Sequence, residues 1–137
     1  MELRDLLMYT IDKQASDLHL TEGMPPLVRV DGRIIATDFP RLSREETKKI
    51  IYSVLSNDQK EKFEEDWELD FSLGLVGLDR FRVNVHVQRG SVEAAFRRIP
   101  LLIPMLDDLG LPRIVSELAR KPNGLVLVTG PTGVGKT

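Results

Sequence analysis

The chain has 137 residues, of which 42% are hydrophobic and 29% are charged, so its composition is that of a folded globular protein. Nineteen Lys and Arg residues against 21 Asp and Glu residues give a net charge of −2, which excludes a globally basic nucleic-acid binder but allows a local anion site. The absence of cysteine excludes disulfides, cysteine-ligated zinc and a thiol nucleophile.

The sequence contains no membrane-spanning pattern. No apolar run reaches the roughly 18 residues of a membrane-spanning helix. The charged start Met1–Asp5 lacks the apolar core of a secretory signal. We expect a cytoplasmic protein with no transmembrane segment and no nucleic-acid partner, whose contact with a membrane would be peripheral.

The first part of the chain predicts one helix and three short strands. Apolar residues recur at helical spacing over residues 3–14. Strands are expected over 17–20, 27–30 and 33–35. Asp31-Gly32 predicts the turn between the last two, because a type I′ turn needs positive φ at both central residues.

Two further helices are expected before the main sheet. Ser43 and Glu46 have the spacing of a capping box, which predicts a helix over residues 44–55. Asn57 is the expected N-cap of a second helix that continues to Asp66.

Residues 69–99 alternate apolar and polar side chains, which predicts antiparallel strands. A two-residue turn at Arg89-Gly90 would place Gln88 opposite Ser91 and fix the register of the hairpin. On the polar face, this register places Arg82 directly opposite Arg97.

Two opposed arginines repel each other, so the pair needs an explanation. One interpretation is that nearby carboxylates neutralise them, or that their heads splay into solvent. The other is an anion site, because guanidinium forks suit phosphate oxygens. In that interpretation Arg82 and Arg97, together with Arg80 on the same face, are candidate catalytic arginine fingers for a bound nucleotide.

Other polar pairs are interpreted as structural. His19 and Asp17 share one face of a strand, and a structural hydrogen bond between them is favoured over acid–base catalysis. His86 opposite Glu93 supplies fewer ligands than the three or four of a usual zinc site.

The C-terminal part begins with Pro100–Pro112, whose three prolines and glycine predict an interdomain linker. A short helix is expected over 113–120. The unalternating apolar run Leu125–Val128 predicts a parallel strand covered on both faces.

The last eight residues match the phosphate-loop pattern G-x-x-x-x-G-K-[ST] at every defined position. In such a loop, backbone N–H groups surround the phosphates, Lys136 faces the β- and γ-phosphates, and the Thr137 hydroxyl ligates Mg²⁺. We therefore predict that ATP and Mg²⁺ bind here. The residues of this predicted cofactor site are Gly130, Pro131, Thr132, Gly133, Val134, Gly135, Lys136 and Thr137.

The sequence stops before the helix and the carboxylates that such a site needs. We expect the chain to be a truncated piece of a longer ATPase, inactive when alone.

Several blocks, taken in order, resemble the N-terminal part of the type IV pilus retraction ATPases, which are secretion-superfamily traffic ATPases. The resemblance covers essentially the whole chain. Its blocks are residues 15–20, 25–32, 80–84, 96–100, 109–112 and 124–133.

The resemblance implies an α+β fold. A PAS-like N-terminal domain with an antiparallel sheet and helices is expected over residues 1–99, followed by a linker over 100–112. The first elements of a RecA-like P-loop α/β domain are expected over 113–137, ending at the Walker A motif.

The resemblance also implies a function in twitching motility. Family members form homo-hexameric rings, bind nucleotide between the two domains and drive type IV pilus assembly proteins of the inner membrane from the cytoplasmic side. Arginines of the N-terminal domain reach the phosphates in this family, and Arg82 and Arg97 lie in the matching blocks.

Two alternatives stay open. Pilus-extension and type II secretion ATPases share these motifs but usually carry an additional N-terminal domain, whereas here the PAS-like pattern begins almost at Met1. Alternatively, the chain is a PAS-like module that binds a small ligand or a partner.

Overall fold

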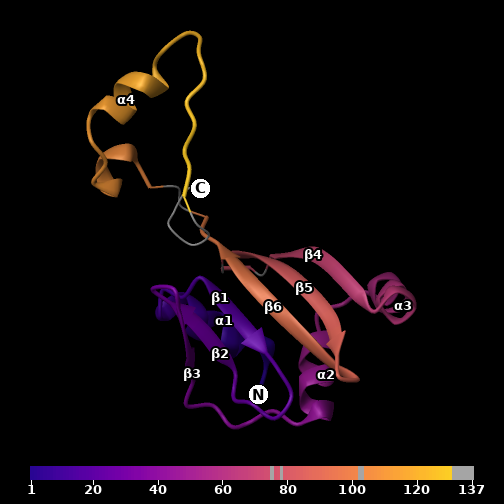
Figure 1. The fold of residues 1–137 in the computed structure, drawn as a ribbon. Coiled ribbons are helices and arrows are strands. Elements are labelled where there is room, and N and C mark those ends of the chain that lie inside the picture. The colour runs from indigo at the N-terminus through magenta and orange to yellow at the C-terminus, as the bar shows by residue number, and fades with distance from the viewer. Residues whose placement is uncertain (75, 78, 102–103, 131–137) are drawn as a thin grey trace. The chain divides into compact units, whose positions relative to one another are not determined.

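The computed structural model describes residues 1–74, 76–77, 79–101 and 104–130. The chain divides into two compact units, Met1–Leu101 and Leu102–Thr137, and each is described by itself (Figure 1).

The first unit is built on a six-stranded antiparallel sheet with the strand order β3-β2-β1-β6-β5-β4 (Figure 1). The central pairing of β1 with β6 joins the first and last strands of the unit in sequence order and places Leu18 opposite Phe96. The strands are β1 (Asp17–Leu20), β2 (Leu27–Val30), β3 (Arg33–Ala36), β4 (Glu68–Gly74), β5 (Arg80–Gln88) and β6 (Ser91–Ile99).

Both predicted tight turns are confirmed. Asp31 and Gly32 have φ values of 48° and 78°, and Arg89 and Gly90 have φ values of 51° and 82°. Positive φ at both central residues matches the twist of the flanking strands, so these turns fix the β2–β3 and β5–β6 registers.

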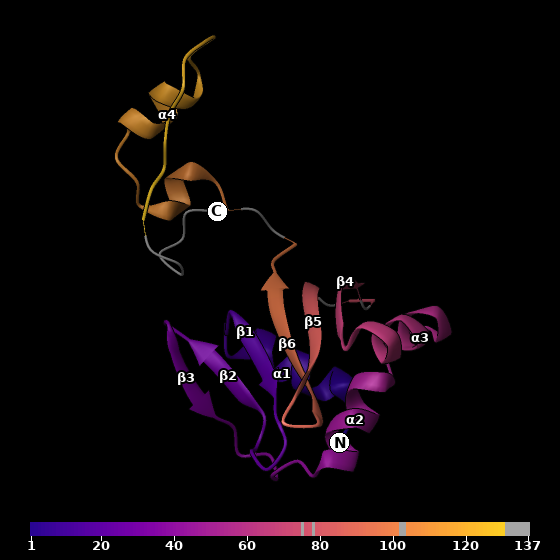
Figure 2. The same cartoon turned by 45° about the vertical axis from the view of Figure 1, so that its right-hand side comes forward.

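The helices are α1 (Leu3–Asp12), α2 (Arg44–Tyr52) and α3 (Asn57–Asp66) (Figure 2). The first helix ends before the expected residue 14, because Gln14 takes a positive φ of 51°. The prediction that Asn57 caps α3 was wrong, since Ser56 is the N-cap. Ser56 forms a full capping box with Gln59, whereas a cap at Asn57 would face Lys60, which has no side-chain acceptor.

The core lies between one face of the sheet and the helices. Alternate strand residues point into it, which leaves the opposite face of the sheet for polar side chains. The largest fully buried side chains include Leu6, Leu7, Leu18, Val28, Ile51, Phe63, Phe81, Val83 and Phe96.

The second unit contains the short 3-10 helix η1 (Leu106–Leu109) and α4 (Ile114–Ala119). The strand expected over Leu125–Val128 is not formed, and these side chains are exposed. A parallel strand needs neighbouring strands and covered faces, and the described residues of this unit include no strand that could pair with it. Among the described residues, no helix has the length and apolar character needed to span a bilayer.

Candidate functional site

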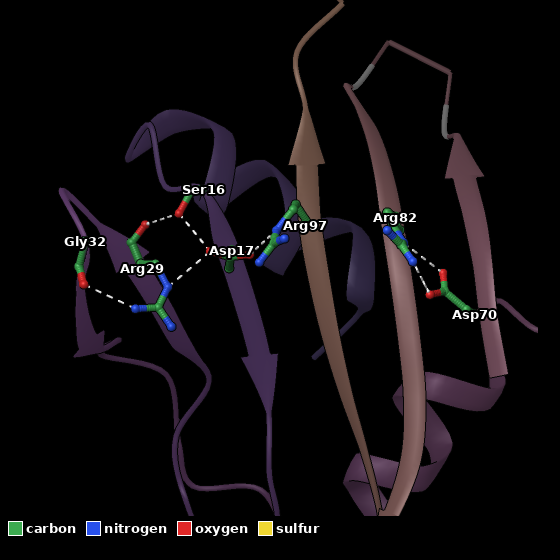
Figure 3. Close-up of polar contacts among 7 residues, drawn as sticks. All are labelled: Ser16, Asp17, Arg29, Gly32, Asp70, Arg82 and Arg97. Carbon is green, nitrogen blue, oxygen red and sulfur yellow. Dashed lines mark hydrogen bonds and ion pairs between the residues drawn. The ribbon is translucent and has the colours of Figure 1, made fainter. Parts of the chain in front are cut away.

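A row of charged side chains crosses the face of the sheet opposite the helices (Figure 3). The strand register places Arg29 on β2 opposite Asp17 on β1, Asp17 opposite Arg97 on β6, and Arg97 opposite Arg82 on β5. We call these four residues the charged row. The predicted opposition of Arg82 and Arg97 is confirmed.

Arg82 is held by a carboxylate on the neighbouring strand β4. Its Nε donates to both oxygens of Asp70 at 3.1 and 3.2 Å, and its Nη2 donates to Oδ2 at 2.7 Å. The two side chains remain 67% and 43% exposed. This pair is therefore a fork-shaped contact at the surface, where water and salt weaken it.

Arg97 is held by a carboxylate that, unlike Asp70, is buried. Its Nε donates to Asp17 Oδ1 at 3.0 Å, while Arg29 Nε donates to Asp17 Oδ2 at 3.1 Å. Ser16 Oγ also donates to Asp17 Oδ2, at 2.8 Å. The side chain of Asp17 is only 8% exposed, so one buried carboxylate anchors two arginines.

These contacts fix the charge states of Asp17 and Asp70. Burial raises the pKa of Asp17, but hydrogen bonds from Arg97 and Ser16 outweigh it, so the pKa lies below its ordinary value. The hydrogen bond from Arg82 lowers the pKa of Asp70. Both carboxyls are therefore charged at neutral pH, and carboxylates do neutralise the opposed arginines, as the first interpretation of the sequence required.

The carboxylates neutralise the arginines only in part, and some guanidinium N–H donors remain available. Arg97 uses only Nε on Asp17, and its side chain is 64% exposed with no further hydrogen bond among the described residues. Arg80, two residues from Arg82 on the same face, donates from Nη2 to Ser72 Oγ at 3.2 Å. The row and Arg80 place four arginines against the two carboxylates that hold them, Asp17 and Asp70, while Glu68 and Glu93 lie farther along the same face. The part of the face at Arg80, Arg82 and Arg97 therefore offers donors to an anion.

His19 does not form the expected hydrogen bond with Asp17. Both oxygens of Asp17 are taken by Ser16, Arg29 and Arg97, and the buried Nε2 of His19 has no hydrogen-bond partner among the described residues. Burial lowers the pKa of His19, so its ring is neutral beside the arginines.

Of the predicted cofactor site, only Gly130 belongs to the described part of the chain. The residues Pro131–Thr137 lie outside it, so the binding of ATP and Mg²⁺ there stays a prediction. Within the described ranges, no group of three or more His, Asp or Glu side chains is arranged to hold a metal ion.

Two residues that matter here were not assigned to the site from the sequence. Asp17 meets Arg97 only through the pairing of β1 with β6, which no local pattern indicates. Asp70 carried a usable signal, because it alternates with Leu69 and Phe71 and therefore lies on the polar face of its strand.

No family model matches the chain, but individual proteins do. It is 40% identical over its whole length to the type IV pilus retraction ATPase PilT of Pseudomonas aeruginosa, of which it covers 40%. The chain is also similar to a crystal structure of the pilus retraction motor PilT with bound ADP, with 50% identity and a TM-score of 0.78. The match covers 99% of this chain and 40% of the PilT chain in that structure. The resemblance to the type IV pilus retraction ATPases is thereby confirmed along the whole chain.

The chain is also similar to a second pilus ATPase and to a type II secretion protein. It is 39% identical to the type IV pilus ATPase PilU of P. aeruginosa over the whole chain, and covers 36% of it. It is 29% identical to the type II secretion system protein E of Aeromonas hydrophila, covering 28% of that protein. The mixed helix and antiparallel-sheet fold is consistent with the N-terminal domain of a traffic ATPase. The chain spans about two fifths of the length of PilT.

Proposed function

We propose that this chain is the N-terminal part of a homo-hexameric motor ATPase that couples ATP hydrolysis to type IV pilus retraction. The observation that carries the proposal is its likeness, over the whole chain, to PilT and to a PilT structure that holds ADP. The motor would act at the cytoplasmic side of the inner membrane, on the pilus assembly proteins there. Identity is lower with the type II secretion protein, at 29%, than with the two pilus ATPases, at 40% and 39%, which favours the pilus.

In this proposal the chain contributes two parts of the nucleotide site. Gly130–Thr137 form the Walker A loop of a RecA-like domain, where Lys136 faces the phosphates and Thr137 ligates Mg²⁺. The PAS-like domain over 1–99, which precedes the linker 100–112, contributes the charged row. Arg97 and Arg82 act as arginine fingers that stabilise negative charge on the transferred phosphate. The exposed side chains of Arg82 and Arg97 on one face of the sheet support this role.

Kinetics of the complete ATPase test the arginine fingers. Arg97→Ala and Arg82→Ala should each slow ATP hydrolysis by about 100-fold or more at saturating ATP, since fingers act on the transition state. Arg33→Ala is the matched control, because Arg33 is an exposed arginine on the edge strand β3, outside the charged row. Turnover by both variants at the rate of the control would remove the two arginines from the catalytic site.

A further inference from the structure

Arg97 and Arg82 oppose each other, yet their carboxylates hold them in different ways. Asp17 is nearly buried and accepts hydrogen bonds from Arg29 and Ser16 as well as from Arg97, so its position is fixed by three residues. Asp70 is exposed and has Arg82 as its ion-pair partner. Arg97 is thus anchored, whereas Arg82 sits in a contact that solvent and ions can replace.

The two contacts also differ in the atoms that they occupy. Asp17 accepts from Nε of Arg97 (Figure 3), and within the described part of the chain Nη1 and Nη2 form no hydrogen bond to it. Asp70 takes both Nε and Nη2 of Arg82, which is the edge of the guanidinium that would bind a phosphate in bidentate fashion. Arg97 can therefore receive an anion as it stands, but Arg82 cannot use its best edge until it leaves Asp70.

We propose that Asp70 is an internal competitor of the phosphate, which holds Arg82 while the site is empty and releases it when an anion has bound Arg97. The inference rests on the proposed contact between this face and a nucleotide phosphate. In this proposal the anion binds Arg97 first and Arg82 second, because Arg97 has free donors among the described residues and lies directly opposite Arg82 on the neighbouring strand. An anion held by Arg97 then attracts the guanidinium of Arg82 as well. The strength of the Asp70–Arg82 ion pair then sets the phosphate concentration at which Arg82 joins Arg97 on the anion.

The test uses the 137-residue chain with inorganic tripolyphosphate as the probe and measures the Nε–Hε NMR signals of Arg82 and Arg97. Variants that replace each arginine by lysine assign the two signals. Titration of the wild-type chain should shift both signals, and Asp70→Asn should tighten binding by roughly threefold, because the competing surface ion pair is gone.

Glu68→Gln is the matched control. Glu68 lies on the same strand and face as Asp70, but in the described part of the chain it accepts a hydrogen bond from Asn84 rather than from an arginine. It removes the same charge without freeing a guanidinium, so it should change the affinity by less than about 1.5-fold at physiological salt. Equal gains from Asp70→Asn and Glu68→Gln would overturn the competitor role and leave the phosphate contact standing. An Arg97 signal that does not respond to the probe in any variant would refute the phosphate contact itself, and the inference with it.

Discussion

Asp17 is the residue that keeps the charged row together, because it is the only carboxylate of the row and is nearly buried between two arginines. Asp17→Asn would leave Arg29 and Arg97 facing a neutral amide that keeps the volume of the carboxyl. We expect the free energy of unfolding to fall by about 1 to 3 kcal/mol, the usual cost of losing charged hydrogen bonds at a buried group. Urea denaturation at neutral pH measures the change, and Asp70→Asn, at an exposed site, should cost clearly less. An equal loss in both variants would contradict the anchoring role of Asp17.

The same residue predicts a dependence of stability on pH. The pKa of Asp17 in the folded chain lies below its ordinary value of 3.8, so its contribution is complete above that value and is lost as the pH falls through the folded pKa. The difference in free energy of unfolding between the wild type and Asp17→Asn should therefore be constant from pH 7 to about pH 5 and shrink below about pH 4. Urea titrations across this range check it, and a difference that grows on acidification would refute the assignment.

At the scale of single elements, two neighbouring residues at the start of α3, Ser56 and Asn57, should differ in how much they stabilise the helix. Ser56→Ala should lower the free energy of unfolding by about 1 kcal/mol, since it removes the acceptor for the Gln59 N–H. Asn57→Ala should have little effect or stabilise slightly, because Asn57 is the first helical residue rather than the cap. Denaturation of the two variants side by side decides the matter. A larger loss at Asn57 would restore it as the cap.

The β5–β6 turn sets the register that brings Arg82 to Arg97, so its glycine is a second element to test. Gly90 has a φ of 82°, and a Cβ added there would meet Arg44 Nη2 at 3.2 Å. Gly90→Ala should destabilise the chain by about 1 kcal/mol, because alanine is strained at positive φ. Gly74→Ala is the control, since Gly74 has ordinary φ and a Cβ added there would meet no atom of the described residues within 4 Å. Equal melting temperatures of the two variants would contradict this account of the turn.

The same elements show what the sequence could predict and what it could not. The β5–β6 register followed from Arg89-Gly90 and the alternation around it, because turn geometry and side-chain period are local properties. The shift of the α3 cap by one residue depended on which of two adjacent polar residues had an acceptor three positions later. The pairing of β1 with β6, and with it the contact of Asp17 with Arg97, depends on tertiary contacts between distant segments, which no local pattern encodes.

At the scale of the whole chain, the two units differ in how much apolar surface they cover. All of the buried core residues belong to the first unit, Met1–Leu101. None of the described residues of the second unit is buried, and Leu125 and Leu127 are 83% and 75% exposed. The core of the first unit is therefore built from its own sheet and helices.

This difference predicts the effect of removing the second unit. A chain of residues 1–101 should unfold in urea at the same midpoint as the 137-residue chain when followed by far-UV circular dichroism, because every side chain of the core is retained. It should also associate less at high concentration in analytical ultracentrifugation, since exposed apolar runs such as Leu125–Val128 promote association. Replacing Leu125 and Leu127 by Ser in the 137-residue chain is the matched control and should reduce association to a similar degree. A midpoint that falls on truncation would show that the second unit stabilises the first, and the core would then have to extend beyond Leu101.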